Sequence, residues 1–402
     1  MEATADPAVA ATTMNATQQR TLATLALGHF AVDSYVGALP ILFPLLMARF
    51  DLDLKTVGLV LLAYSGCAAI SQPLFGWLAD RIGTRYVGIA LLWSAVVFAL
   101  IGFAPSFPLV IAIAAAAGLG SGAYHPFGAL SAHRLIPPAQ RNRAMSLYVT
   151  GGTLGVAVGP LICIALVGQF GLAGTAGLCA LGIIIGPWLL WELRGLPTTP
   201  LRRAVAPRAM PPIPWRPLAV TVGVMMAING VLYSIEAFVP TWYDLQGYVP
   251  AFYGPLATVL LLAHAVGAVA AGWLADRFGR RRVAIASLIA LAPALWIFTS
   301  FSGPIAFVTI ALVGLSVAAA GPLLLLTAQQ MMAERAGMAS GMIMGVGFIT
   351  GAIGVPITGA FGDLWGLQTA LRLLMLVIGV GIALAWFLPD ERASTQRGAH
   401  AS

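Results

Sequence analysis

Charged side chains are scarce in this chain: Asp, Glu, Lys and Arg make up only 9% of its 402 residues, whereas a soluble domain carries about 25%. Hydrophobic residues make up 59%, and a fold in water cannot bury that much apolar surface. Hydrophobic stretches of roughly twenty residues recur from Leu22 to Leu388, each long enough to cross a hydrocarbon core of about 30 Å as a helix. The runs are continuous, whereas membrane barrel strands alternate over about ten residues. The sequence therefore predicts an all-α polytopic membrane protein.

Several functional signals are also missing. The three cysteines, Cys67, Cys163 and Cys179, lie within apolar runs, and their spacing fits neither a zinc site nor a disulfide framework. Residues 1–20 lack the charged start, apolar run and cleavage site of a signal peptide, so we expect the first hydrophobic run to be retained as a helix. There is no soluble catalytic domain, phosphate loop or nucleophile beside an obvious base. We therefore expect neither enzyme activity nor a cofactor.

The basic residues are distributed unevenly around the predicted spans. Twelve spans are expected, at 22–48, 57–79, 85–104, 107–133, 142–168, 171–193, 217–243, 253–275, 283–302, 304–332, 338–362 and 367–388. Of the 21 basic residues, all but Arg49, Lys55 and Arg372 fall on one side of the membrane. The positive-inside rule makes that side cytoplasmic, and both termini with it. The net charge of +7 then reflects topology, and nucleic acid is not an expected partner.

An internal repeat divides the chain into two halves. The segment GWLADRIG at 76–83 returns as GWLADRFG at 272–279, with seven of eight positions identical and an offset of 196 residues. Gly151 and Pro160 return at the same offset as Gly347 and Pro356. Six spans per half give equivalent spans the same orientation, which indicates parallel repeats.

The repeat sets the expected domain boundaries. The stretch between the halves is rich in proline and arginine, a composition that resists regular structure. The expected parts are a cytoplasmic tail (1–20), a first six-helix bundle (21–193), a cytoplasmic linker (194–216), a second six-helix bundle (217–389) and a cytoplasmic tail (390–402).

These features together resemble the major facilitator superfamily. Twelve spans, a parallel repeat and a doubled Gly-x-Leu-Ala-Asp-Arg-x-Gly loop carry the likeness from about Thr21 to Pro389. Within it, GHFAVD at 28–33, GLGSGAYHP at 118–126 and GGTLGVAVGP at 151–160 resemble the fosmidomycin resistance protein group. The resemblance implies a monomeric exporter of the bacterial inner membrane, driven by inward proton flow. The chain departs from many drug–proton antiporters because the span 107–133 has no central arginine.

Ionisable side chains within membrane spans are costly and usually face a cavity. His29 and Asp33 are four residues apart and share one helix face. Asp33 is a candidate protonation site that His29 modulates, although the pair can instead be a polar lock on helix packing. Glu236, in the equivalent span of the second half, is a candidate for proton or cation binding. The alternative is that it lies solvated near the outer mouth.

Other polar residues in the spans are candidates for substrate binding. His125 precedes a proline and can gate, bind substrate or cap a freed carbonyl, while Asn229 occupies the repeat position of Asp33. The substrate-binding candidates are His125, Tyr124, Asn229, Tyr233 and His264. Because the histidines lie on separate spans, we expect no metal site.

The repeated loop predicts a conformational switch. Glycines there allow helices to approach closely, and the aspartates can accept hydrogen bonds from helix N-termini or pair with arginines. The switch residues are Gly76, Asp80, Arg81, Gly83 and Arg85, with Gly272, Asp276, Arg277, Gly279 and Arg281 in the second half. The alternative is that the arginines merely set topology. The antiporter-like stretch contributes Gly151, Gly155, Gly159 and Pro160, which we expect to seal the two halves against each other. The alternative is ordinary close packing of helices.

Three functions remain open at this point. The first is proton-coupled export of small molecules by alternating access, with cationic or neutral substrates favoured by the acidic interior. The second is uptake of a nutrient by proton symport, which the same fold supports. The third, a membrane receptor or membrane-embedded enzyme, lacks any supporting domain or motif.

Overall fold

The computed structural model describes residues 14–137, 140–195, 212–318, 320–332 and 336–389. Within these ranges every regular element is a helix. The helices are α2 (Ala16–Phe50), α3 (Leu54–Ile82), α4 (Val87–Ala99), η1 (Leu100–Phe103), α5 (Phe107–Leu135), α6 (Arg141–Phe170), η3 (Gly171–Gly174), α7 (Thr175–Leu193), α8 (Trp215–Leu245), α9 (Pro250–Phe278), α10 (Arg280–Ser300), α11 (Ile305–Ala318), α12 (Ala320–Met331), α13 (Ala336–Trp365) and α14 (Leu367–Ala385).

The helices confirm the predicted fold class. Among the described residues, ten segments are long and apolar enough to cross a membrane, and the one at 145–193 contains most of α6 and all of α7. A shorter apolar helix at Val87–Phe103 completes the set of twelve. The predicted span 304–332 corresponds to α11 and α12, and residue 319 between them lies outside the described residues. Residues 1–13 of the predicted N-terminal tail, the predicted C-terminal tail and most of the linker lie outside the described residues. The helix α2 begins at Ala16, within the stretch predicted as a tail.

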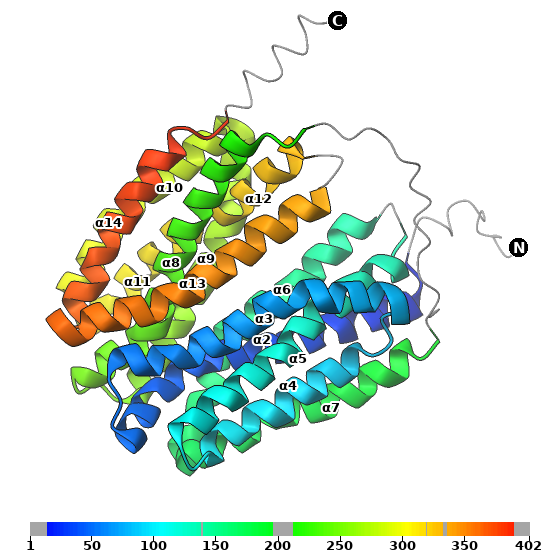
Figure 1. Cartoon of the computed structure of the whole chain (residues 1–402), viewed down its shortest axis with the longest axis horizontal. Helices are drawn as coiled ribbons and strands as arrows, with labels where there is room; N and C mark the ends of the chain where they lie inside the picture. Colours follow the sequence, from blue (N-terminus) through cyan, green and yellow to red (C-terminus); the bar gives the residue numbers. More distant parts are fainter. Residues whose placement is uncertain (1–13, 138–139, 196–211, 319, 333–335, 390–402) are drawn as a thin grey trace, which may run out of the picture. The chain divides into compact units, whose positions relative to one another are not determined.

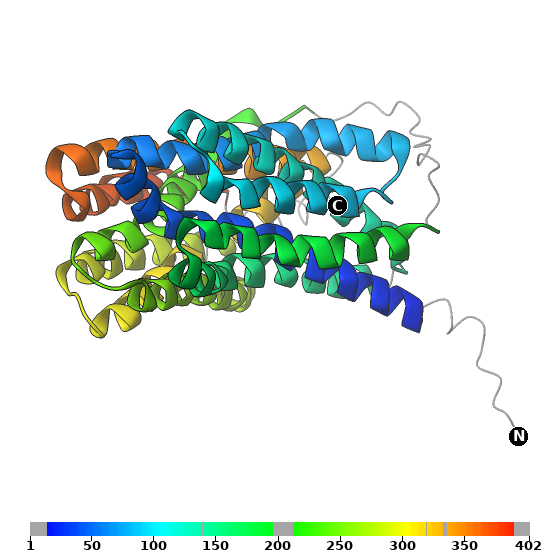
Figure 2. The same ribbon diagram turned by 90° about the horizontal axis from the view of Figure 1, so that it is seen from below.

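The helices form two compact units. Unit 1 comprises residues 1–42 and 63–204, and unit 2 comprises residues 43–62 and 205–402. The division at 204/205 falls within the predicted linker. Residues 43–62, which form the end of α2 and the start of α3, belong to unit 2. The sequence had predicted that these residues belong to the first bundle. In unit 1, α4 packs on α5 and α7, while in unit 2 α13 packs on α8 and α11 on α9 (Figures 1 and 2).

A ridge of glycines joins α6 to α2 inside unit 1. A Cβ atom added to Gly151, Gly155 or Gly159 would overlap the backbone carbonyl of a residue in α2, at Ala26, Phe30 and Ser34 respectively. Both series are spaced by four residues, so the two helices contact along matching faces. The prediction that this stretch seals the two halves is therefore wrong. It holds two helices of the same unit at backbone contact.

The repeat places α13 against α8 in unit 2 in the same way. A Cβ atom on Gly351 would overlap the ring of Tyr233, and one on Gly347 would overlap the side-chain amide of Asn229. Here the glycines admit polar and aromatic side chains, whereas in unit 1 they admit backbone. The same small-residue pattern thus builds two chemically different contacts.

Two glycines of the repeated loop end their helices. Gly83 and Gly279 have φ angles of 81° and 89°, which other residues rarely adopt, and their amides bond back to Ala79 and Ala275. The other two loop glycines were predicted to allow close helix approach, and this is wrong. The nearest atom to a Cβ on Gly76 would be 3.8 Å away, and Gly272 has open space around it.

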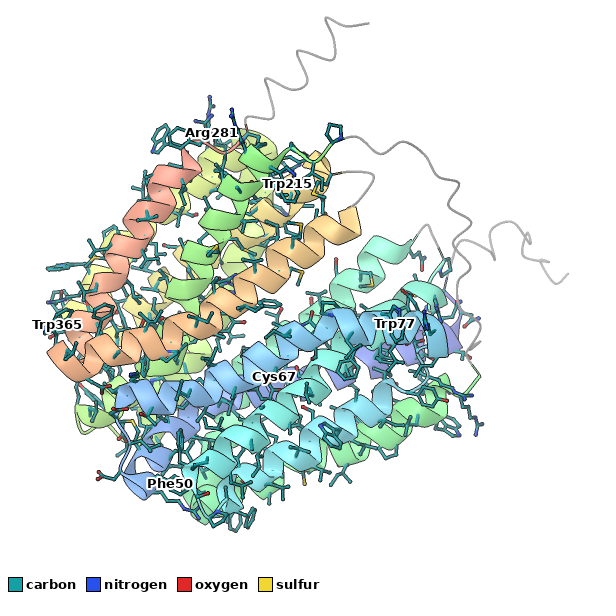
Figure 3. The ribbon with its side chains drawn as sticks, in the orientation of Figure 1. Phe50, Cys67, Trp77, Trp215, Arg281 and Trp365 are labelled. Atoms are coloured by element: carbon teal, nitrogen blue, oxygen red, sulfur yellow. The ribbon has the colours of Figure 1, made fainter. Side chains whose placement is uncertain are left out.

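Exposed tryptophans lie near helix ends. Trp77 near the end of α3, Trp215 at the start of α8 and Trp365 at the end of α13 are labelled in Figure 3. Each has at least half of its surface exposed, at 51%, 60% and 56%. An amphipathic indole at a helix end suits the interface between lipid and water.

The first turn of α3 is held by an acidic side chain from α13, within unit 2. The Asp363 carboxylate accepts hydrogen bonds from the amides of Leu54 and Lys55 at 2.8 and 2.9 Å. Asp53 caps the same turn by accepting from the Thr56 amide at 2.7 Å, and hydrogen bonding from Thr56 lowers the pKa of the Asp53 carboxyl. These contacts satisfy amides that have no partner within the helix.

Replacing Asp363 with asparagine is expected to destabilise the protein by about 1 kcal/mol. The asparagine side chain has one acceptor oxygen in place of two, and it lacks the negative charge that is favourable at a helix N-terminus. Thermal unfolding of the purified protein in detergent measures the effect. Asp51→Asn is the matched control, since Asp51 is exposed and has a φ of 53° that asparagine tolerates. Equal melting temperatures for both variants would contradict the prediction.

Candidate functional site

Three ionisable side chains meet in the interior of unit 1. His29 and Asp33 share one face of α2, and their Nε2 and Oδ2 atoms are 3.2 Å apart, as the four-residue spacing predicted. His125 reaches the same carboxylate from α5, with its Nε2 atom 3.3 Å from Oδ1. Sequence analysis grouped His125 with substrate binding, and the structure places it beside Asp33.

Hydrogen bonds to the backbone orient both imidazoles. The Nδ1 atom of His29 is 2.9 Å from the Tyr148 carbonyl oxygen, and that of His125 is 2.7 Å from the Ser121 carbonyl oxygen. A carbonyl oxygen only accepts, so each Nδ1 carries a hydrogen and donates it. The Nε2 atoms of both rings therefore face Asp33. The proline after His125 frees the carbonyl of Gly122, so the imidazole does not cap that group.

The contacts between the two Nε2 atoms and the Asp33 carboxylate are favourable only when a positive charge is present. In a neutral imidazole whose Nδ1 is protonated, Nε2 carries a lone pair and no hydrogen. An ionised carboxylate also offers only lone pairs, so two such atoms at hydrogen-bond distance repel each other. The contacts of Asp33 with His29 and His125 become attractive once a cation lies between the paired atoms. The cluster is accordingly built to hold cations.

Aromatic rings and a glycine enclose the cluster. The His29 ring stacks on Tyr148 with centroids 4.3 Å apart, and the Tyr124 hydroxyl donates to the Leu25 carbonyl at 2.7 Å. A Cβ atom added to Gly152 in α6 would lie 2.5 Å from Asp33 Oδ2 and 2.6 Å from His29 Nε2. The absence of a side chain at position 152 thus leaves room for the cluster.

Burial differs among the three members. The side chains of His29 and Asp33 are 8% and 14% exposed, whereas that of His125 is 31% exposed. His125 is therefore the member with the most open approach. Tyr124 is fully buried and its hydroxyl is already engaged, so its role in this structure is packing rather than ligand contact.

The cluster also has the composition of a metal site. One ligand atom from each of His29, Asp33 and His125 lies within 4.8 Å of the others. The sequence-based expectation of no metal site assumed that histidines on separate helices stay apart. α2 and α5 bring two of them onto one carboxylate.

The polar candidates of unit 2 are arranged differently. Asn229 in α8 is 8% exposed, and its side-chain nitrogen has no hydrogen-bond partner among the described residues. Glu236 is two turns further along α8, and its carboxylate has no hydrogen bond or ion pair within the described part of the chain. His264 lies on α9 and joins no ion pair there. The described part of unit 2 therefore has no equivalent of the three-residue cluster of unit 1.

The loop arginines contact aromatic rings and backbone. Arg81 lies 4.0 Å from the ring centre of Trp77, and Arg85 contacts the ring and hydroxyl of Tyr86. In the second half, Arg281 donates to the Trp386 carbonyl. Asp80 and Asp276 form no ion pair with any described residue. The switch role of these loops stays a prediction.

Comparison with known sequences places the chain in a family. A profile of the Major Facilitator Superfamily matches residues 25–261 and 249–401. The chain belongs to the major facilitator superfamily. Its all-helical architecture agrees with that membership, and so does its internal repeat.

Individual superfamily members resemble the chain over most of its length. An uncharacterized transporter of Bacillus subtilis is 28% identical over 90% of this chain and 91% of its own. The fosmidomycin resistance protein of Escherichia coli is 25% identical over 96% of both chains. A crystal structure of a bacterial homologue of the human lysosomal transporter Spinster matches with a TM-score of 0.79 at 15% identity, covering 94% of this chain and 97% of that one. The chain is thus a multi-pass membrane transporter of this superfamily.

Proposed function

We propose that this superfamily member exports small molecules from the cytoplasm by alternating access, and that inward proton flow drives it. The observation that carries the proposal is the presence of ionisable groups inside two membrane helices, Asp33 with His29 in α2 and Glu236 in α8. Such groups are rare in membrane spans and usually mark a transport pathway.

Resemblance supports the direction of transport. The fosmidomycin resistance protein, similar over nearly the whole chain, is named for resistance to a drug. The glycine-rich stretch 151–160 resembles the antiporter motif of drug exporters. Export therefore stands ahead of uptake by proton symport, and no structural feature favours uptake.

Glu236 is the group that we expect to exchange protons. A membrane-embedded carboxylate without a cationic partner is costly in its charged form, so proton binding is favoured whenever water is excluded. Its position on α8 corresponds to the face of α2 that carries Asp33. Asn229 and Tyr233 lie on the same side of α8 by helical spacing, as expected for substrate contacts.

The proposed location is the bacterial inner membrane, with both termini in the cytoplasm. The support is the asymmetry of basic residues: all but Arg49, Lys55 and Arg372 fall on the side of the termini. We also propose that the protein acts as a monomer, on the strength of the family resemblance.

Glu236→Gln is expected to abolish proton-driven transport, because the amide keeps the size of the carboxylate and cannot release a proton. The measurement uses everted vesicles carrying the protein, with a pH-sensitive dye that reports proton release on substrate addition. Wild-type vesicles should accumulate substrate and release protons, whereas Glu236→Gln vesicles should do neither. Asp51→Asn, which neutralises an exposed carboxylate, tests for effects of the lost charge alone.

Two outcomes would overturn the proposal. Co-accumulation of protons and substrate in right-side-out vesicles would show symport instead of export. Transport that is unchanged in Glu236→Gln would remove this residue from proton coupling.

A further inference from the structure

We propose that His29, Asp33 and His125 form a binding site for one divalent first-row transition-metal ion, of the zinc or cobalt class. The inference goes beyond the proposed export function and does not depend on it, because it concerns a cluster inside unit 1 alone. It rests on ligand identity, ligand spacing and the orientation of the two imidazoles.

The ligand set suits such an ion. Imidazole nitrogen and carboxylate oxygen are common zinc ligands, and two histidines with one carboxylate recur in sites that keep an open position. Hard cations such as Mg²⁺ and Ca²⁺ prefer all-oxygen ligands and would gain little from the two nitrogens. The chemistry therefore selects a transition metal over an alkaline-earth ion.

The distances fit ligands of one ion. Metal–nitrogen and metal–oxygen bonds of about 2.0 Å in a tetrahedron place neighbouring ligand atoms about 3.3 Å apart. His29 Nε2 lies 3.2 Å from Asp33 Oδ2 and His125 Nε2 lies 3.3 Å from Asp33 Oδ1, and one ligand atom from each residue lies within 4.8 Å of the others. An ion can thus approach the carboxylate and both Nε2 atoms with small side-chain movements.

The surrounding hydrogen bonds are those of a metal site. Histidines that bind metals usually donate their other ring N–H to a carbonyl or carboxylate, which fixes the ring and the tautomer. Both His29 and His125 do this, to the carbonyls of Tyr148 and Ser121. The lone pair of each Nε2 is thereby aimed at the space around Asp33 before any ion arrives.

Charge also favours a single divalent ion. An ionised Asp33 between two neutral imidazoles has a net negative charge and two contacts that lack a cation. One divalent ion stabilises both contacts at once, whereas protons are needed separately at each contact. The His125 side chain is 31% exposed, so water or a ligand can approach an ion held there from that side.

The cluster is not a requirement of the fold. At the repeat offset of 196, His29, Asp33 and His125 correspond to Met225, Asn229 and Gly321. Gly152 corresponds to Phe348, so the position that is a glycine beside the cluster is not a glycine in the second half. Unit 2 packs α8 on α13 without this cluster, so packing alone does not explain its presence in unit 1.

The test is metal binding by the purified full-length protein in detergent. Isothermal titration with Zn²⁺ gives affinity and stoichiometry, and Co²⁺ absorption in the visible range reports imidazole and carboxylate coordination. His133→Gln, near the end of α5, and His400→Gln, near the C-terminus, are introduced throughout to remove two of the histidines that are not proposed as ligands. We expect one ion per chain in this background.

Ligand variants assign the site. Asp33→Asn and His125→Gln should each weaken binding by about 100-fold or more, since loss of even an outer partner costs about 10–100-fold. Asp33→His keeps three ligand atoms and should restore binding and the Co²⁺ spectrum. His264→Gln, the other histidine in a membrane helix, should bind as the background does. Monodisperse gel filtration confirms that each variant is folded.

Several results would overturn the inference. Absence of saturable Zn²⁺ binding would show that the cluster holds protons only. Binding that survives both Asp33→Asn and His125→Gln would place the ion elsewhere. Glu236→Gln should leave Zn²⁺ binding unchanged while it stops transport. Zn²⁺ titration therefore tests the metal site, and the vesicle assay tests the export proposal independently.

Discussion

Asp33→Asn is expected to abolish the protection that the protein gives to cells against its substrate, with susceptibility returning to that of cells lacking the gene. The physical reason is the loss of the only anion in the cluster with His29 and His125. An asparagine amide donates a hydrogen bond to one Nε2 lone pair and needs no cation. Position 33 then no longer carries a carboxyl that can hold and release a proton, which the proposed coupling to inward proton flow requires.

The measurement is a susceptibility screen in a host lacking its own exporters. A panel of drugs and metabolites that includes fosmidomycin is applied to cells with the empty vector, the wild-type gene and Asp33→Asn. Asp51→Asn is the control, because Asp51 is an exposed carboxylate at the end of α2. Immunoblots of membrane fractions establish equal amounts of protein. If Asp33→Asn protects as well as wild type, the cluster has no part in transport.

Gly155→Ala is expected to destabilise the protein by about 1–3 kcal/mol, the usual cost of adding a methyl group to a close-packed interface. The added Cβ atom would overlap the backbone carbonyl of Phe30, and backbone cannot rotate away as a side chain can. The helices α2 and α6 would have to separate. Since His29 and Asp33 lie on that stretch of α2, the site should be disturbed as well.

Gly168→Ala provides the matched control on the same helix. A Cβ atom at position 168 meets nothing within 4 Å, and alanine has the higher helix propensity. Thermal unfolding in detergent should show a lower midpoint for Gly155→Ala and an unchanged or higher one for Gly168→Ala. Equal midpoints would show that α2 and α6 are not in backbone contact.

Part of the site was predictable from the sequence, but the addition of His125 to the His29–Asp33 pair was not. The His29–Asp33 contact was predictable because residues four apart on a helix are neighbours whatever the tertiary fold. His125 could not be joined to them in the same way, because helix packing brings α5 beside α2. A signal for it was present in the polar histidine placed before Pro126 in an otherwise apolar span.

The glycine stretch of α6 shows the same limit. Its spacing of four residues predicted a close helix contact, and that contact exists. Spacing does not name the partner, however, and the expected partner in the other half was wrong. The partner is α2, so the stretch supports the cluster instead of sealing the halves.

The sequence by itself determined that the chain is a twelve-helix membrane transporter of two repeated halves. Hydrophobic run length, the side on which arginines lie and a repeat at constant offset are properties of the chain order, and lipid imposes the helix on each run. Only the tertiary structure decided that two histidines from different helices share one aspartate, with both Nε2 atoms aimed at it. That depends on which helix faces meet and which carbonyls fix the rings, and neither follows from the order of residues along one helix.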